Sequence, residues 1–276
     1  MSTASKSRKK YLQNFWKYRF LLKEIVNKNV KLQYRNSVLG MFWTFLQPLL
    51  TTIVLILVFG GLFNKGGKPG EYAVYLLCGR LLYEFFTQST KRGMRSIRNS
   101  ASVIKKVYVP KYIYPLSNVI STFVTFCISL TVLIAVMLYF VIKYQGATPI
   151  HFSWNMLLVF LPVGVLLVLS LGVGLLLSVL DVYFKDIEYI YDVFTMLLFY
   201  VTPILYKVDQ MKFSPIVAKV IEANPLYSII SMFRCFIIGG TWDWNWLIYS
   251  ATFSVVLFLI SVFVFYKAQD KFILHI

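Results

Sequence analysis

Charged residues are scarce in this sequence of 276 residues, and few of them are acidic. Only 14% of the residues are charged, against about 25% in an average soluble domain, whereas 58% are hydrophobic. A chain so poor in charge cannot cover a water-facing surface. The stretches 36–64, 112–142, 144–180 and 244–266 contain no charged residue at all. The composition therefore predicts an integral membrane protein.

Histidine and cysteine are also rare, which argues against several kinds of metal and cofactor site. The two histidines, His151 and His275, do not have the spacing of metal ligands. The three cysteines, Cys78, Cys127 and Cys235, lie singly in apolar stretches. No phosphate-binding loop of the form G-x-x-x-x-G-K-[ST] occurs. We therefore expect no metal or cofactor in this chain, and no ATP hydrolysis by the chain alone.

The acidic residues are concentrated between residues 181 and 192, where four carboxylates gather: Asp181, Asp186, Glu188 and Asp192. Such a cluster could hold a metal ion for transfer chemistry on a lipid phosphate, so a membrane glycosyl- or phosphotransferase is one alternative. Aromatic residues and a lysine interrupt the carboxylates, however, as in a surface that docks another protein. The docking interpretation is the one we follow.

Basic residues are abundant by comparison, with 28 Lys and Arg against 11 Asp and Glu and a formal charge of +17. They crowd into a few segments between apolar stretches, as the positive-inside rule and contact with anionic lipid require. Membrane lipids, rather than nucleic acid, are the expected partners of these charges.

The N-terminal region predicts a basic cytoplasmic tail over residues 1–13 and an amphipathic interfacial helix over 14–36. Charges recur there at helical spacing, and apolar residues occupy another face. The charged face contains Lys17, Glu24, Lys28, Lys31 and Arg35, and the apolar face Phe15, Tyr18, Leu22, Ile25 and Val26. A solvated helix packed on a soluble partner is the alternative. No uncharged run suggests a cleaved signal peptide, so a cytoplasmic N-terminus is expected.

The rest of the chain, 37–276, predicts an all-α membrane domain of six transmembrane helices with a re-entrant helical hairpin before the last span. The expected spans are 39–63, 72–91, 113–142, 155–180, 187–206 and 245–266. The hairpin, 213–240, contains two apolar pieces broken at Asn224 and Pro225, each too short to cross alone. A seventh span over 214–238 stays open. With both termini inside, 20 Lys and Arg lie on the cytoplasmic side and six outside.

Three polar residues lie inside the second predicted span at helical spacing: Arg80, Glu84 and Gln88. Such groups are costly in hydrocarbon and usually face a bundle interior or a wet cavity. We expect Arg80 and Glu84 to pair, either at a functional site or as a structural salt bridge between helix turns.

Aromatic residues make up 18% of the chain. Many suit membrane interfaces, but Phe42 and Trp43 in the first span, and Phe199 and Tyr200 in the fifth, are candidates for the wall of a conduit. Aromatic faces there could stack on sugar rings. Ordinary core or lipid-facing positions are the alternative.

Four stretches, read together and in this order, resemble the membrane subunit of type-2 ABC exporters. They are Leu39-Gly40-Met41-Phe42-Trp43 with Gln47-Pro48, Lys105 to Lys111 with Pro115, Asp181 to Ile187 with Thr202-Pro203-Ile204, and Asn224-Pro225-Leu226 with Arg234. The branch they resemble comprises the polysaccharide and polyol-phosphate permeases, which move lipid-linked O-antigen, teichoic acid or capsular glycans. The similarity runs from about residue 14 to the C-terminus. One departure is Lys185, where the family more often has Arg, which alone makes a planar bidentate contact.

This resemblance implies a homodimer in the bacterial cytoplasmic membrane, with both termini cytoplasmic, served by two copies of a nucleotide-binding subunit that binds ATP and Mg. It also implies that 91–111 contains a coupling segment, that 181–189 is a second contact with that subunit, and that the hairpin caps the path outside. The coupling residues would be Lys105, Lys106, Tyr108, Pro110, Tyr183, Phe184, Lys185 and Asp186.

The sequence thus predicts the permease of an exporter of lipid-linked (undecaprenyl-diphosphate) polysaccharide or teichoic acid. Lys28, Lys31 and Arg35 are the available cations for the diphosphate at the cytoplasmic entrance; contact with lipid headgroups is their alternative role. A drug or small-lipid exporter of the same fold is the second hypothesis for function. A scaffold protein is a further one, although it would not need Arg80 and Glu84 inside a span.

Overall fold

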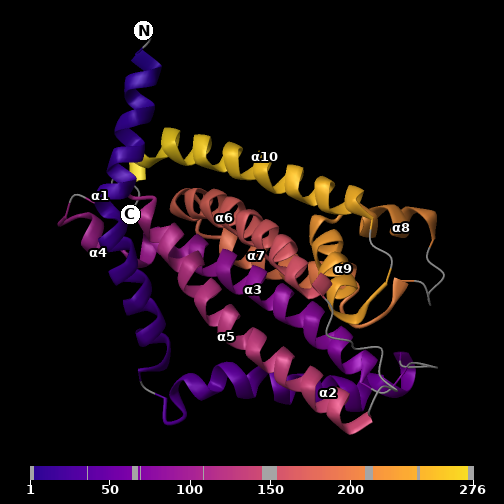
Figure 1. Ribbon diagram of the computed structural model, residues 1–276. Coiled ribbons are helices and arrows are strands. Elements are labelled where there is room, and N and C mark those ends of the chain that lie inside the picture. Colours follow the sequence, from indigo (N-terminus) through magenta and orange to yellow (C-terminus); the bar gives the residue numbers. More distant parts are fainter. Residues whose placement is uncertain are drawn as a thin grey trace.

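The computed structural model describes residues 3–35, 37–63, 68, 70–107, 109–144, 154–208, 214–240 and 243–272. Within these ranges every regular element is a helix, which confirms the predicted all-α class. Figure 1 shows the long helices α3, α5 and α6 side by side, with α10 along one edge of this group and α2 along the opposite edge.

The first helix, α1, spans Thr3–Tyr34, so the predicted tail and the predicted amphipathic helix form one continuous element. No Gly or Pro interrupts these residues, and Lys, Arg and Leu favour helix throughout. A turn follows, in which Gly40 has a φ of +50°, a conformation that suits glycine. The chain continues into the short 3-10 helix η1 (Gly40–Phe42) and then α2 (Trp43–Phe63). In Figure 1, α1 runs across the direction of α2 and α10.

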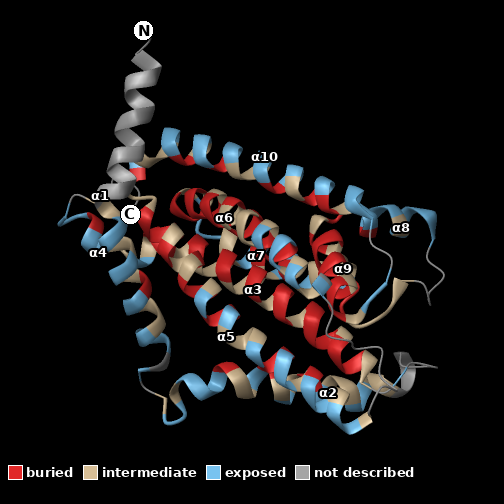
Figure 2. Cartoon of the chain, viewed as in Figure 1, coloured by how far each residue is buried: buried red, intermediate tan, exposed pale blue. Residues whose placement is uncertain are grey.

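The centre of the fold is α3 (Glu71–Asn99), in which 18 of 29 residues are buried. It packs between α5 (Ile113–Tyr144) and α6 (Phe160–Tyr183), and α6 packs in turn on α10 (Trp244–Ala268). Figure 2 shows buried residues running along α3, whereas one side of α10 is exposed. A Cβ atom on Gly93 would lie 3.1 Å from the Cα atom of Gly174. Paired glycines therefore let the backbones of α3 and α6 approach closely.

Shorter helices lie at the two ends of this group. The helix α4 (Ala101–Ile104) follows α3 after a single residue, and α7 (Ile187–Val201) follows α6 after a short turn. The helices α8 (Pro215–Glu222) and α9 (Pro225–Ile238) are bent by 75° relative to one another. Ser214 and Asn224 cap their N-termini by accepting from backbone N–H groups, and each helix begins with Pro. The 3-10 helices η2 (Trp154–Val159) and η4 (Gln269–Lys271) adjoin α6 and α10.

Four described segments are long and apolar enough to cross a membrane: Gly40–Gly60, Ile113–Tyr144, Met156–Tyr183 and Trp244–Lys271. The bent pair α8 and α9 would be a fifth if it crossed as one span. The predicted spans 72–91 and 187–206 do not meet these criteria. The first contains Arg80 and Glu84, and the helix of the second ends at Val201. A helix of 15 residues is only about 22 Å long.

The second of these helices ends early because Pro203 follows. A residue that precedes proline is disfavoured in the helical region, and Thr202 is extended, with φ −82° and ψ 118°. The predicted fifth helix, 187–206, is therefore too long by five residues.

The two ends of the fold differ in charge. One end, which we call the basic end, contains α4, the turn between α6 and α7, and the last described residues of the chain (Figure 1). The other, the hairpin end, contains α8 and the connections to α9 and α10. The seven Lys and Arg of residues 91–111 belong to the basic end.

Candidate functional site

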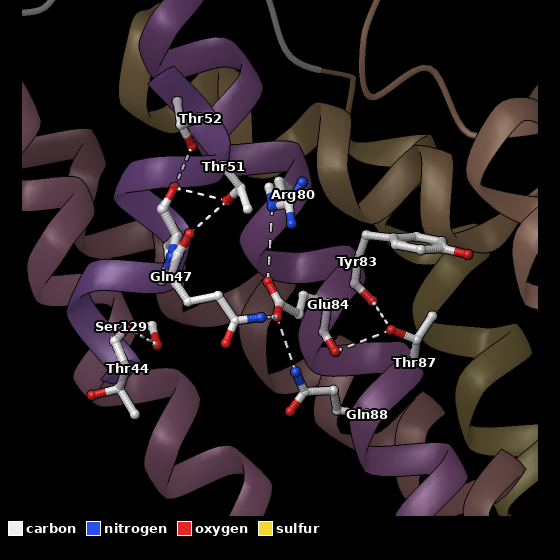
Figure 3. Close-up of polar contacts among 11 residues, drawn as sticks. Thr44, Gln47, Thr51, Thr52, Arg80, Tyr83, Glu84, Thr87, Gln88 and Ser129 are labelled. Atoms are coloured by element: carbon white, nitrogen blue, oxygen red, sulfur yellow. Dashed lines mark hydrogen bonds and ion pairs between the residues drawn. The ribbon is translucent and has the colours of Figure 1, made fainter. Parts of the chain in front are cut away.

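The polar residues predicted inside the second span lie beside α2 (Figure 3). Arg80 Nε is 3.9 Å from Glu84 Oε2, and the Gln88 side-chain amide donates to Glu84 Oε1 at 2.9 Å. The Gln47 amide of α2 donates to the same oxygen at 3.1 Å. One carboxylate therefore links three side chains from two helices. Gln47 entered the sequence analysis only through the family resemblance, which does not indicate this contact.

A polar cavity adjoins Glu84 between α1, α2, α3 and α5. Its volume is about 80 Å³, enough for a few water molecules. Hydroxyl and amide groups form much of its wall, together with the Trp43 ring; the polar lining residues are Gln33, Thr44, Gln47, Glu84, Gln88, Thr122, Thr125 and Ser129. A cavity with so many polar groups can hold water or a hydroxyl-rich group.

Three of the four candidate conduit aromatics line cavities, and they line two different ones. Trp43 borders the Glu84 cavity, and Phe42 beside it is 56% exposed. Phe199 and Tyr200 border a more open groove of about 280 Å³ between α3 and α7, where Tyr83, Thr87 and Thr195 also lie. The ring of Phe199 packs edge-on against Tyr83, with centroids 5.3 Å apart. A single copy of the chain therefore does not bring the two aromatic pairs together.

The predicted coupling residues lie at the basic end. Lys105 and Lys106 are exposed just after α4, and the apolar side chains of Val103 in α4 and Val107 after it are exposed too. Pro110 is half-buried, and Tyr108 lies outside the described residues. In the turn between α6 and α7, Phe184, Lys185 and Asp186 are exposed, whereas Tyr183 is half-buried and donates to the Ala268 carbonyl.

Both exposed segments rest on one apolar cluster. It contains Ile104 of α4, Val182 of α6 and Phe272, which has no exposed surface. The Phe272 ring packs against Tyr183 and Phe265, and the Lys111 ammonium lies 5.7 Å from its centroid. Burial lowers the pKa of Lys111, which donates to the Gln269 carbonyl. Sequence reasoning missed Phe272, because a single aromatic residue near the chain end gives no local signal of its partners.

The carboxylates between residues 181 and 192 are mostly engaged within the chain. Asp192 pairs with Lys91, Glu188 with Arg95 and Arg98, and the fully buried Asp181 with Arg98. The hydrogen bond to Glu188 raises the pKa of Arg98. The basic segment and the acidic segment were both predicted to dock another subunit. The charged side chains in the helical parts of the two segments form ion pairs with one another. The exposed turn and the region around α4 remain available to a partner.

Comparison with known proteins supports a transporter. The sequence model of the family described as "ABC-2 type transporter" matches residues 21–238. The chain belongs to this family. It is 31% identical over 254 residues to an O-antigen export system permease protein RfbA of Klebsiella pneumoniae, covering 91% of this chain and 93% of that protein. It is 25% identical over 262 residues to the protein of the same name from Myxococcus xanthus, covering 95% and 97%. The chain is thus a multi-pass membrane protein of the ABC-2 type.

In this ABC-2 type protein the apolar face of α1 packs on its own α5. Val26 is buried there and Ile25 is half-buried, whereas the candidate diphosphate residues Lys28, Lys31 and Arg35 are all exposed. Gln33 accepts from Arg92 of α3 at 2.9 Å. Part of the apolar face therefore contacts α5, and the interfacial position of this helix at the membrane stays a prediction.

Arg234, from the fourth stretch of the family resemblance, is buried at the hairpin end. Its guanidinium donates to the carbonyls of Tyr75, Pro203 and Ile204 and lies 3.5 Å from the centre of the Tyr75 ring. Five N–H groups in a fixed plane suit such a set of acceptors. Arg234 thereby joins α9, α3 and the segment after α7.

Proposed function

We propose that this chain is the permease of an ABC transporter that exports a lipid-linked polysaccharide of the O-antigen class across the bacterial cytoplasmic membrane. The observation that carries the proposal is the similarity to O-antigen export permeases over more than nine-tenths of both chains. The polar cavity at Glu84 and the aromatic groove at Phe199 support it, because hydroxyl-rich chains pair with amides, carboxylates and aromatic faces.

The basic end would face the cytoplasm. The excess of Lys and Arg at this end agrees with the positive-inside rule. Both termini would then be cytoplasmic. Two permease copies would assemble around a central path, and two copies of a separate subunit would bind ATP and Mg below them. The exposed residues Lys105, Lys106 and Phe184 are the part of this end that such a subunit would meet.

Six spans follow if α3 and α7 also cross. The helices α2, α5 and α6, which pack on α3, would shield much of its polar surface from lipid, so α3 need not be apolar throughout. The α7 span would be short. The segment after it, whose Pro203 and Ile204 carbonyls accept from Arg234, would complete the crossing. The α8 and α9 pair would enter from the outside and turn back.

The substrate would be an undecaprenyl-diphosphate glycan. Lys28, Lys31 and Arg35 on α1 supply exposed cations for a diphosphate at the cytoplasmic surface. The aromatic side chains of Phe42, Trp43, Phe199 and Tyr200 would offer weak stacking contacts that let the glycan slide. A teichoic acid, which is also carried on this lipid, would use the same groups.

The experiment is complementation of a strain that lacks this chain, together with ATPase assays on the chain purified alone and with its candidate partner. We expect surface glycan to be lost in the deletion strain and restored by the chain, and lipid-linked glycan to stimulate hydrolysis only in the complex. Stimulation by hydrophobic drugs alone, with surface glycan unchanged, would identify a drug exporter instead. Turnover by the chain alone on a lipid phosphate would identify a transferase.

A further inference from the structure

Four ion pairs form a ladder between α3 and the α6–α7 region, and we call them the α3–α7 ladder. Its members are Lys91 Nζ with Asp192 Oδ1 at 2.8 Å, Arg95 Nη2 with Glu188 Oε1 at 2.5 Å, and Arg98 with both Glu188 and Asp181. The three bases are spaced by four and three residues, so they form one stripe on α3. Glu188 and Asp192, four residues apart, form the opposing stripe on α7.

The ladder accounts for much of the attachment of α7. Of the 15 residues of α7, only Tyr191 and Thr195 are buried. Both of these contact α3: the Tyr191 hydroxyl donates to Thr90 Oγ1 at 2.7 Å, and the Tyr83 hydroxyl donates to the Thr195 carbonyl. The outer face of α7 contains Tyr189, Ile190, Val193, Phe194, Met196, Leu197 and Tyr200, all of which are exposed. Polar contacts with α3 therefore hold α7 in place together with the apolar packing of Tyr191 against Met94 and Leu177.

The ladder extends along α3 from the end that adjoins α4 to the groove beside α7. The last base, Arg98, precedes Asn99 at the end of α3, and α4 begins at Ala101. A displacement of α4 would therefore move the ladder bases first, because α3 is one unbroken helix over them. The other end of the ladder is Asp192, which borders the groove of Tyr200 and Phe199.

We propose that the α3–α7 ladder transmits movement of α4 to α7, and so to the aromatic face of α7. The inference rests on the proposed function in one respect: the movement of α4 would come from an ATP-binding partner. Charged pairs suit this task better than apolar packing alone. They favour one register of the two helices, since a slip of one turn would leave at least one charged group without its partner. Asp181, which is buried and pairs with Arg98, anchors α6 to the same point.

The test reverses one charge of a single ion pair of the ladder, here called a rung, and then restores the pair by exchanging both charges. Lys91 and Asp192 form the simplest rung, because each pairs with the other in the described part of the chain. Three variants are compared with the unaltered chain, all in complex with the ATPase partner: Lys91→Asp, Asp192→Lys and the double exchange. Lys219→Asp, an exposed lysine of α8 at the hairpin end, is the matched control. The measurements are hydrogen exchange of α7 amides with and without ATP, ATP hydrolysis and glycan export.

We expect each single reversal to speed exchange in α7 and to abolish its response to ATP. Export per ATP hydrolysed should fall about tenfold, a common size for coupling between sites. The double exchange should recover exchange, ATP response and export, and Lys219→Asp should change none of them. The inference is overturned if a single reversal leaves α7 exchange and its ATP response unchanged, or if the double exchange fails to recover them. Absence of glycan export by the unaltered chain would contradict the proposed function but not the ladder, because the exchange measurements need no substrate.

Discussion

Gln47 of α2 donates its side-chain amide to the Glu84 carboxylate of α3 across the helix interface, with 3.1 Å between nitrogen and oxygen (Figure 3). The apolar side chains of Leu50, Val54 and Leu57 on α2 are largely exposed. The polar contact therefore has a large share in holding α2 to α3.

Replacement Gln47→Glu keeps the shape of the side chain but places a second carboxylate against Glu84. We expect a loss of about 1 to 3 kcal/mol in the free energy of unfolding, because a donor to a charged group is removed. Thermal unfolding in detergent measures it. Thr51→Val is the control, since its hydroxyl donates only to carbonyls of α2 and should cost under about 0.5 kcal/mol. Equal effects of the two changes would contradict the role of Gln47.

Arg80 and Glu84 should differ in what their removal costs. Glu84→Leu deprives two amides of their acceptor, whereas Arg80→Leu breaks one long ion pair. We expect Glu84→Leu to be the more destabilising, and the two changes to be coupled by about 1 kcal/mol or less, because each side chain is 23% exposed. A double-mutant cycle measures the coupling, and strictly additive effects would show that the side chains do not interact.

Gly79 is predicted to tolerate no side chain. A Cβ atom there would lie 2.2 Å from Nη2 of Arg234, which donates to the Ile204 carbonyl. Gly79→Ala should therefore cost about 1 to 3 kcal/mol of stability through overpacking. Gly164→Ala in α6, where nothing lies within 4 Å of the new atom, should be neutral or stabilising. A Gly79→Ala chain as stable as the control would show that the Arg234 contacts are dispensable.

Phe272→Ala should leave a cavity in the apolar cluster beneath α4. Loss of a fully buried phenylalanine costs about 3 to 5 kcal/mol, and Phe272 has no exposed surface. We also expect weaker stimulation of the partner ATPase, because Ile104 shares the cluster. Phe263→Ala on α10 is the control, since its ring is 67% exposed. Unchanged melting and ATPase activity in the Phe272 variant would contradict this account.

The ion pair of Glu71 with Lys207 should make stability depend on pH. Burial alone would raise the pKa of Glu71, but hydrogen bonds from Lys207 and the Lys68 backbone outweigh it, so the pKa lies below its ordinary 4.5. The pair therefore stabilises the fold above that value and is lost as the pH falls through the lowered pKa. The difference in melting between the unaltered chain and Glu71→Gln should shrink as the pH falls through the lowered pKa of Glu71. A constant difference would refute the assignment.

The long apolar helices could be predicted well from the sequence. The expected spans 113–142 and 245–266 differ by at most two residues at either end from α5 and α10. Hydrophobic runs without charges identify such helices directly. The end of α3 was harder, because the charges of residues 91–98 suggest a cytoplasmic loop. They form helix instead, since acidic residues about a hundred positions later neutralise them.

The candidate site was predicted only in part, for a related reason. The sequence spacing alone identifies Arg80, Glu84 and Gln88 as neighbours, because residues four apart on one helix lie side by side. Gln47, Phe272 and Arg234 acquire their roles from contacts with distant segments. Local patterns contain no information on such partners.

The burial of α3 also bears on how the protein is made. Arg80 and Glu84 are expensive to place in lipid, at about 2.5 kcal/mol or more for a charged residue at mid-membrane. Two helices that pack on α3, α5 and α6, are synthesised later, because both follow α3 in the chain, and α5 also lines the cavity at Glu84. On the proposed topology, α3 would therefore wait at the translocon or beside an insertase until its covering helices emerge. Membrane integration of this protein would then be cooperative among several helices rather than sequential, one helix at a time.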